Sequence, residues 1–204
     1  MSSQVFVVAA PSGAGKTSLV RALVERSDNL QLSVSHTTRD PRSGEVDGEH
    51  YHFIDMPAYE ALVAADAFLE HAMVHGNGYG SGVSEVERAA VAGADLLLEI
   101  DWQGAQQVKQ ALPNAISIFI LPPSRAALAE RLRGRGQDSD AVIARRLAAA
   151  QSEMVHWEEF DYVVVNDDFE VALTDLAAIV TSARLAQGYQ GARLEALLKD
   201  LLDH

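Results

Sequence analysis

Residues 4–26 read QVFVVAAPSGAGKTSLVRALVER, and this stretch decides the fold. It begins with a short apolar run, rich in valine, that Pro11 ends, which is typical of a strand buried on both faces. From Ser18 onward, apolar residues recur at the spacing of an α-helix. The stretch therefore predicts a strand, a glycine-rich loop and a helix in direct succession.

The loop reads APSGAGKT, residues 10–17, and departs from the phosphate-binding pattern G-x-x-x-x-G-K-[ST] only at Ala10. Its glycines allow backbone amides to converge on phosphate oxygens, while Lys16 can reach the outer phosphates and the Thr17 hydroxyl can bind Mg²⁺. A glycine-rich turn that happens to contain lysine is the alternative. We predict that the loop binds a nucleoside triphosphate through Ala10, Pro11, Ser12, Gly13, Ala14, Gly15, Lys16, Thr17 and Ser18.

Strands and helices alternate along the rest of the chain. Short apolar runs predict strands over 4–10, 30–35, 94–101, 115–121 and 161–166, and helical spacing predicts helices over 57–65, 84–92, 102–112, 124–133, 140–156, 169–187 and 191–202. The alternation predicts an α/β fold like that of P-loop NTPases, in which a parallel sheet has helices on both faces.

Residues 36–83 interrupt the alternation. Within them Asp47-Gly48 predicts a hairpin turn, just before the alternating segment HYHFI. We interpret 36–83 as an inserted lobe with β character. Because the chain has 204 residues and no linker-like tract, we expect a single domain that carries this insertion.

The composition restricts the class of protein. The chain has 48% hydrophobic and 22% charged residues, typical of a globular protein, and no cysteine, which excludes disulfides, thiolate metal sites and cysteine catalysis. The apolar run before Pro11 is too short for a membrane span. The formal net charge of −13 argues against nucleic acid or an anionic membrane as a partner. We therefore expect a cytoplasmic protein that holds any anionic ligand locally.

Two acids, Glu99 and Asp101, close the predicted strand 94–101. A parallel sheet presents its ligand crevice beyond the carboxyl ends of its strands, so one of these acids should support Mg²⁺ through water, and Glu99 is the candidate. An ordinary solvated strand end is the alternative.

The predicted lobe contains residues suited to a second, phosphorylated substrate. Arg39, Arg42 and Tyr51 could grip one phosphate monoester through charge-assisted hydrogen bonds. Downstream, the Glu70 carboxylate could accept hydrogen bonds from both N1–H and the exocyclic amine of guanine, whereas adenine presents no such pair of donors. The lobe therefore favours GMP over AMP.

Several strings resemble motifs of the guanylate kinase family. They are APSGAGKT, SVSHTTRDPRSGEVDGEHYHF, FLEHA with GNGYG, LLEIDWQGAQQV and RLRGRGQDSDAVIARRLAAAQSEM, and together they extend over essentially the whole chain. The resemblance implies a GMP-binding lobe over 36–83, a lid over 134–156 and a core over 1–35, 84–133 and 157–204.

The resemblance also implies roles for single residues. Those that would address guanine are Ser35, Glu70, Ser81 and Asp101. Those that would bind the GMP phosphate are Arg39, Arg42, Tyr51 and Tyr79, with Glu45 in the same lobe. The lid arginines Arg135 and Arg146 would reach the ATP phosphates, and Asn166 would lie near the adenine.

The implied reaction is phosphoryl transfer from MgATP to GMP, and also to dGMP, in purine nucleotide metabolism. No general base is needed because the GMP phosphate is already ionised, so catalysis would come from alignment and from positive charge. The residues expected to supply that charge are Lys16, Arg42, Arg135 and Arg146.

Three positions depart from the family pattern, and one of them is Ala10, which replaces the first glycine of the loop and which the family tolerates. Glu99 stands where aspartate is usual, and Ser81 stands where a threonine often follows Gly80. A non-catalytic binding module with this fold, or a kinase for another phosphorylated acceptor, are the alternative functions. The amphipathic C-terminal helix leaves open whether it covers the core or forms an interface in a homo-oligomer.

Overall fold

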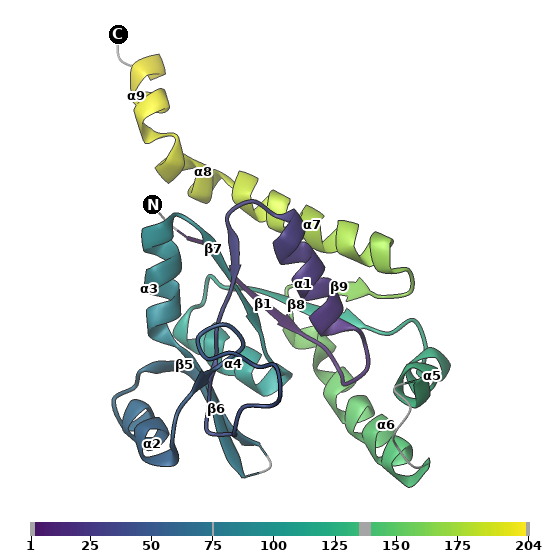
Figure 1. The fold of residues 1–204 in the computed structure, drawn as a ribbon. Helices are drawn as coiled ribbons and strands as arrows, with labels where there is room; N and C mark the ends of the chain where they lie inside the picture. The colour runs from purple at the N-terminus through teal and green to yellow at the C-terminus, as the bar shows by residue number, and fades with distance from the viewer. Residues whose placement is uncertain (1–2, 75, 135–139, 203–204) are drawn as a thin grey trace.

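The structure is a computed structural model that describes residues 3–74, 76–134 and 140–202. Its centre is a five-stranded sheet in the order β2-β7-β1-β8-β9 (Figure 1). Each neighbouring pair of strands is parallel. The strands are β1 (Val5–Ala9), β2 (Leu30–Leu32), β7 (Asp95–Glu99), β8 (Ile116–Leu121) and β9 (Tyr162–Val165). The predicted α/β class and parallel sheet are confirmed.

Helices cover both faces of this sheet (Figure 1). Phe6 and Val8 of β1 pack against α1 (Lys16–Arg26) and α7 (Phe169–Leu185) on one face. Val5 and Val7 pack on the other face, against α3 (Val83–Ala92) and α4 (Trp102–Ala111). Successive side chains of a strand point to opposite faces, so a strand covered on both sides needs the continuous apolar run seen here.

A second sheet, in the order β4-β3-β6-β5, lies within the stretch predicted as an inserted lobe. Its strands are β3 (His36–Thr37), β4 (His52–Phe53), β5 (Phe68–Val74) and β6 (Asn77–Gly82), and α2 (Met56–Ala64) precedes β5. The hairpin predicted at Asp47-Gly48 is wrong, because β3 and β4 run parallel. Gly48 instead forms a tight turn in which its N–H donates to the Tyr51 carbonyl at 2.8 Å. The antiparallel hairpin of this sheet is β5–β6.

The segment between β8 and β9 consists of α5 (Arg125–Gly134), α6 (Asp140–Met154) and the 3₁₀ helix η1 (Val155–Glu159). Leu128 and Leu132 of α5 pack with Ile143 and Ala150 of α6 in a small apolar cluster of their own. The two helices are therefore held to each other.

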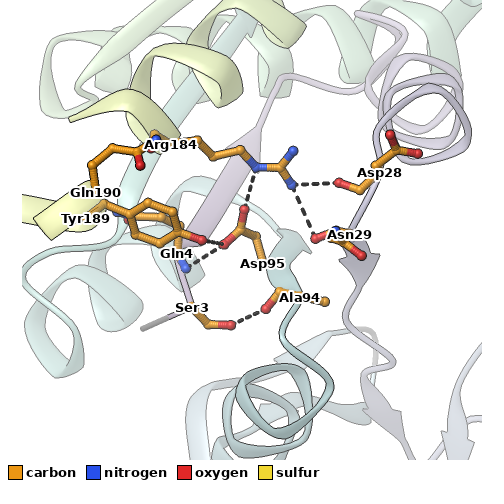
Figure 2. A network of polar contacts seen from close by, with 9 residues as sticks. All are labelled: Ser3, Gln4, Asp28, Asn29, Ala94, Asp95, Arg184, Tyr189 and Gln190. Carbon is orange, nitrogen blue, oxygen red and sulfur yellow. Dashed lines mark hydrogen bonds and ion pairs between the residues drawn. The ribbon is translucent and has the colours of Figure 1, made fainter. Parts of the chain in front are cut away.

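A buried carboxylate ties the C-terminal helices to the amino end of the sheet (Figure 2). Asp95, 2% exposed, accepts hydrogen bonds from the Gln4 N–H at 2.8 Å, Arg184 Nε at 2.7 Å and the Tyr189 hydroxyl at 3.0 Å. Arg184 belongs to α7 and Tyr189 to α8 (Gln187–Arg193). This network lies at the opposite end of β7 from Glu99, so it serves the fold and not the site.

The last helix, α9 (Glu195–Leu202), projects from the body of the molecule (Figure 1). All its residues are exposed, including Leu197, Leu198, Leu201 and Leu202. It therefore does not cover the core, and association of two copies through it stays a prediction. In the part of the chain that the structure describes, no helix combines the length and the apolar character needed to span a membrane.

Candidate nucleotide site

The loop between β1 and α1 has the backbone of a phosphate-binding loop. Gly13 and Gly15 both have φ of 93°, in the left-handed region that residues with a side chain rarely adopt. Gly15 is the N-cap of α1, so the first amides of that helix face the loop. A Cβ on Gly15 would also collide with the Asn166 side-chain amide. Both the conformation and the space thus require glycine at this position.

Asn166 supports the loop from the end of β9. Its side chain is buried, and its amide nitrogen donates to the Ala14 carbonyl at 2.7 Å. The Asn166 carbonyl accepts in turn from the Arg131 guanidinium at 2.8 Å. Asn166 therefore holds the backbone of the loop, and its predicted place near the adenine stays a prediction.

Replacement of Asn166 by alanine should loosen this loop. The Ala14 carbonyl would lose its buried donor, which costs about 1–3 kcal/mol of folding free energy. We expect a lower melting temperature and a raised KM for the triphosphate, both measurable by thermal unfolding and steady-state kinetics. The control is Asn114→Ala, since Asn114 is exposed. A KM unchanged from the native protein would show that the hydrogen bond does not shape the loop.

The carboxyl end of β7 meets the start of α1. The Thr17 hydroxyl donates to Glu99 Oε1 at 2.5 Å, and Lys16 Nζ donates to the Ile100 carbonyl at 2.6 Å. A hydroxyl beside a carboxylate is the kind of all-oxygen donor set that Mg²⁺ prefers, so these side chains fit the ion. Burial lowers the pKa of Lys16, while the negative charges of Glu99 and Asp101 oppose that shift.

Glu70 and Ser81 are buried in the second sheet, and Ser35 lies directly before β3. The Ser81 hydroxyl donates to Glu70 Oε1 at 2.7 Å, and Ser35 Oγ lies 3.1 Å from Ser81 Oγ. Burial raises the pKa of Glu70, and Asp101 adds to that shift, whereas the hydrogen bond from Ser81 opposes it. Glu70 is thus a buried carboxylate held by Ser81. Asp101 caps α4 by accepting from the Gly104 N–H at 2.8 Å.

Arg39 lies in a polar and aromatic cluster of the same lobe. It makes a two-pronged ion pair with Glu45, with nitrogen–oxygen distances of 2.9 and 3.0 Å. Its guanidinium lies 5.5 Å from the centre of the Tyr51 ring, and Tyr79 meets Tyr51 edge to face at 6.1 Å. Arg42 is exposed, and its backbone N–H donates to Glu45 at 2.7 Å. Glu45 therefore holds the Arg39 side chain and the Arg42 backbone.

One cavity of about 600 Å³ joins the loop to the lobe. Lys16, Thr17 and Glu99 line it from the core, Glu45 and Tyr51 line it from the lobe, and Ser35 lines it directly before the lobe begins. Residues that are far apart in the sequence thus face one space, with the phosphate loop at one side and the segment between β3 and β4 at the other.

Helix α6 contacts the loop at Ser12. The Arg146 guanidinium donates to the Ser12 hydroxyl at 3.0 Å, and the Ser12 N–H donates to Glu153 Oε2 at 3.1 Å. Burial raises the pKa of Glu153, and the Ser12 N–H opposes that shift. Arg135, the second predicted lid arginine, lies outside the described residues. The helix therefore brings Arg146 into contact with the loop, and its predicted reach to the ATP phosphates stays a prediction.

The family model described as guanylate kinase matches residues 2–183. The chain belongs to the guanylate kinase family. It is 53% identical over 200 residues to the guanylate kinase of Escherichia coli K12, covering 97% of each chain. It is 55% identical over 203 residues to that of Nitrosococcus oceani, covering 100% of both. A crystal structure of guanylate kinase from Anaplasma phagocytophilum superimposes with a TM-score of 0.72 at 34% identity, over 91% of this chain and 88% of that one.

Sequence reasoning missed some residues of this guanylate kinase site. Arg21, Glu49 and His50 also line the central cavity. Glu153 was not singled out, although it follows Arg146 by seven residues and so lies on the same face of a helix. Arg131 of α5, which carried no predicted role, donates to the Asn166 backbone carbonyl. That contact joins residues 35 positions apart and has no local signal.

Proposed function

We propose that the chain transfers the terminal phosphoryl group of MgATP to GMP, giving ADP and GDP. An oxygen of the GMP phosphate attacks the terminal phosphorus of ATP, and the bond from that phosphorus to the bridging oxygen breaks. The observation that carries this proposal is the cavity that has Lys16 and Thr17 of the phosphate loop on one side and Glu45 and Tyr51 of the lobe on the other. Two phosphorylated ligands can meet there.

The loop and α1 would hold the donor. Backbone amides from Ala10 to Ser18 would surround the ATP phosphates, with Lys16 directed at the outer ones. Thr17 and Glu99 would hold the metal, Glu99 through water. When bound, Mg²⁺ supplies charge neutralisation to the phosphate oxygens. The longer side chain of Glu99 is compatible with this role, because it already reaches the Thr17 hydroxyl.

The lobe would hold the acceptor. Glu70, fixed by Ser81, would accept from N1–H and the amine of guanine, with Ser35 and Asp101 completing the recognition of the base. Arg39, Arg42, Tyr51 and Tyr79 would bind its phosphate, with Glu45 orienting the arginines. Since this recognition addresses base and phosphate, dGMP would be an acceptor too.

Catalysis would rest on alignment and positive charge, with no residue acting as general base. Lys16, Arg42 and Arg146 are the candidates among the described residues, and Arg135 is a further one outside them. A non-catalytic module is disfavoured because Lys16, Thr17 and Arg146 are all in place around the loop. The net charge of −13 and the absence of cysteine favour the cytoplasm as the location, and small-molecule partners over nucleic acid.

A coupled assay of ADP release across GMP, dGMP, AMP, UMP and CMP tests the function. GMP should be the preferred acceptor, with dGMP next. A preference for AMP or for a pyrimidine nucleotide would refute the proposed recognition of guanine. Turnover with none of them would favour a different acceptor or a binding module.

A Glu70→Gln variant should lose discrimination between GMP and AMP. The new amide donor would face the donors of guanine, so the KM for GMP should rise by about tenfold to a hundredfold with little change for AMP. Because burial raises the pKa of Glu70, loss of its charge should not destabilise the fold. Glu60→Gln, at an exposed position of α2, is the matched control. Unchanged selectivity in Glu70→Gln would exclude this carboxylate from base recognition.

A further inference from the structure

A ring stack joins the lid segment to the helix that follows Asp101. Helix α6 continues directly into η1, and the His156 imidazole of η1 lies flat on the Trp102 indole, with ring centres 3.4 Å apart and planes 8° from parallel. Glu159 of η1 links the same two helical segments a second time. His156 Nδ1 lies 2.6 Å from Glu159 Oε1, and the side-chain amide of Gln106 in α4 donates to the same carboxylate. The stack thus fixes where α6 ends against α4.

Trp102 belongs to the part of α4 that touches the acceptor lobe. It is the first residue of the helix, directly after Asp101, which is the N-cap. In the same turn Gly104 is packed so closely on Glu70 that a Cβ there would lie 2.9 Å from Glu70 Oε2. Any shift of Glu70 or Asp101 on binding a base would therefore move the first turn of α4.

The other side of the stack leads to the phosphate loop. Glu153 accepts from the Ser12 N–H and lies three residues before His156, with no break between α6 and η1. Arg146, further along the same helix, donates to the Ser12 hydroxyl. A tilt of η1 would therefore change how α6 sits on the loop.

We propose that His156 and Trp102 are positioning residues that couple occupation of the acceptor lobe to the seating of α6 on the phosphate loop. The proposal rests on the proposed function, because it takes Glu70 and Asp101 as the groups that meet the acceptor. The coupling is reciprocal, so GMP should tighten the binding of the donor and the donor should tighten the binding of GMP to the same extent.

The stack, more than the polar contacts around it, is the element suited to this role. Glu159 is exposed, and the contacts of an exposed carboxylate with Gln106 and His156 are weak in water. The flat faces of Trp102 and His156 are half-buried and transmit a displacement by direct contact. A ring at position 156 should therefore suffice, whether or not it pairs with Glu159.

The test compares His156→Ala with His156→Phe in the full chain. The dissociation constant of a non-hydrolysable ATP analogue with Mg²⁺ is measured by calorimetry, with and without saturating GMP. His156→Ala should bind each nucleotide alone like the native protein but lose about fivefold or more of the enhancement by GMP, a typical size for such a coupling. His156→Phe should keep the enhancement. Trp157→Phe, at an exposed neighbour with no stacked partner among the described residues, should match the native protein.

A double-variant cycle separates coupling from a merely structural role. If the two rings act as one unit, Trp102→Leu with His156→Ala should show the same loss of enhancement as His156→Ala alone. Additive losses would overturn the proposal. The proposal would also be overturned if His156→Ala kept the enhancement by GMP, or if it bound each nucleotide alone more weakly than the native protein by the same factor. Turnover of GMP by the native chain is measured first, and its absence would refute the proposed function; normal turnover with unaltered coupling in His156→Ala would refute only this inference.

Discussion

A Lys16→Met variant is expected to lose turnover by about a hundredfold to a thousandfold while remaining folded. Lys16 follows Gly15 at the start of α1, and its ammonium reaches the end of β7, where it donates to the Ile100 carbonyl at 2.6 Å. It lines the cavity that joins the loop and the lobe. Among the described residues, no other lysine lines this cavity, and Lys16 is the cation at the start of α1 beside the phosphate loop.

The fold should tolerate this change. Burial lowers the pKa of Lys16, which means that the charged form is disfavoured by its surroundings, and methionine keeps most of the apolar stem. Circular dichroism and the melting temperature should therefore match those of the native protein. Lys199→Met, on the exposed helix α9, is the control and should keep full activity. Near-native kcat in Lys16→Met would remove this residue from the catalytic set.

The parts of the fold with local signals were predictable from the sequence. The strand before the loop, the loop and α1 were predicted because their apolar spacing and glycines lie within residues 4–26. The predicted start of the helix at Ser18 was late by two residues, since Lys16 and Thr17 already belong to its first turn. A polar first turn carries no apolar periodicity, so the pattern could not reveal it.

Contacts between distant segments were not predictable in the same way. The turn signal at Asp47-Gly48 is local and real, but β4 pairs with β3 in parallel, a choice that depends on how the lobe closes. The bond from Asn166 to Ala14 joins residues 152 positions apart, and only the structure shows that this amide supports the loop. The family resemblance marked Asn166 as important without the physical reason.

The ion pair between Arg39 and Glu45 was also not predictable from the sequence. The sequence offered Arg39 and Arg42 as two similar cations, three residues apart. In the structure Arg39 is held in a two-pronged pair and lies over an aromatic ring, whereas the Arg42 side chain is exposed. Their predicted binding of one phosphate stays a prediction, but the structure places the two side chains in different surroundings.

An Arg146→Ala variant is expected to lower kcat by about a thousandfold, with a much smaller change in the KM for ATP. The guanidinium donates to Ser12 in the phosphate loop at 3.0 Å, so it lies next to the groups that would hold the outer phosphates. Charge placed there opposes the negative charge that spreads over the transferring group, and an interaction made mainly in the transition state raises kcat rather than affinity.

Arg145→Ala is the matched control, because Arg145 is adjacent on the same helix and its side chain is exposed. It should keep native kcat, which would exclude a general effect of lowering the positive charge of α6. Steady-state kinetics at saturating GMP, with ATP varied, separate the two parameters. Near-normal kcat with only a raised ATP requirement in Arg146→Ala would assign this residue to ground-state binding of the donor. In that case α6 would affect the reaction only through its contacts with Ser12 in the phosphate loop, and Arg146 would contribute no charge to the transition state.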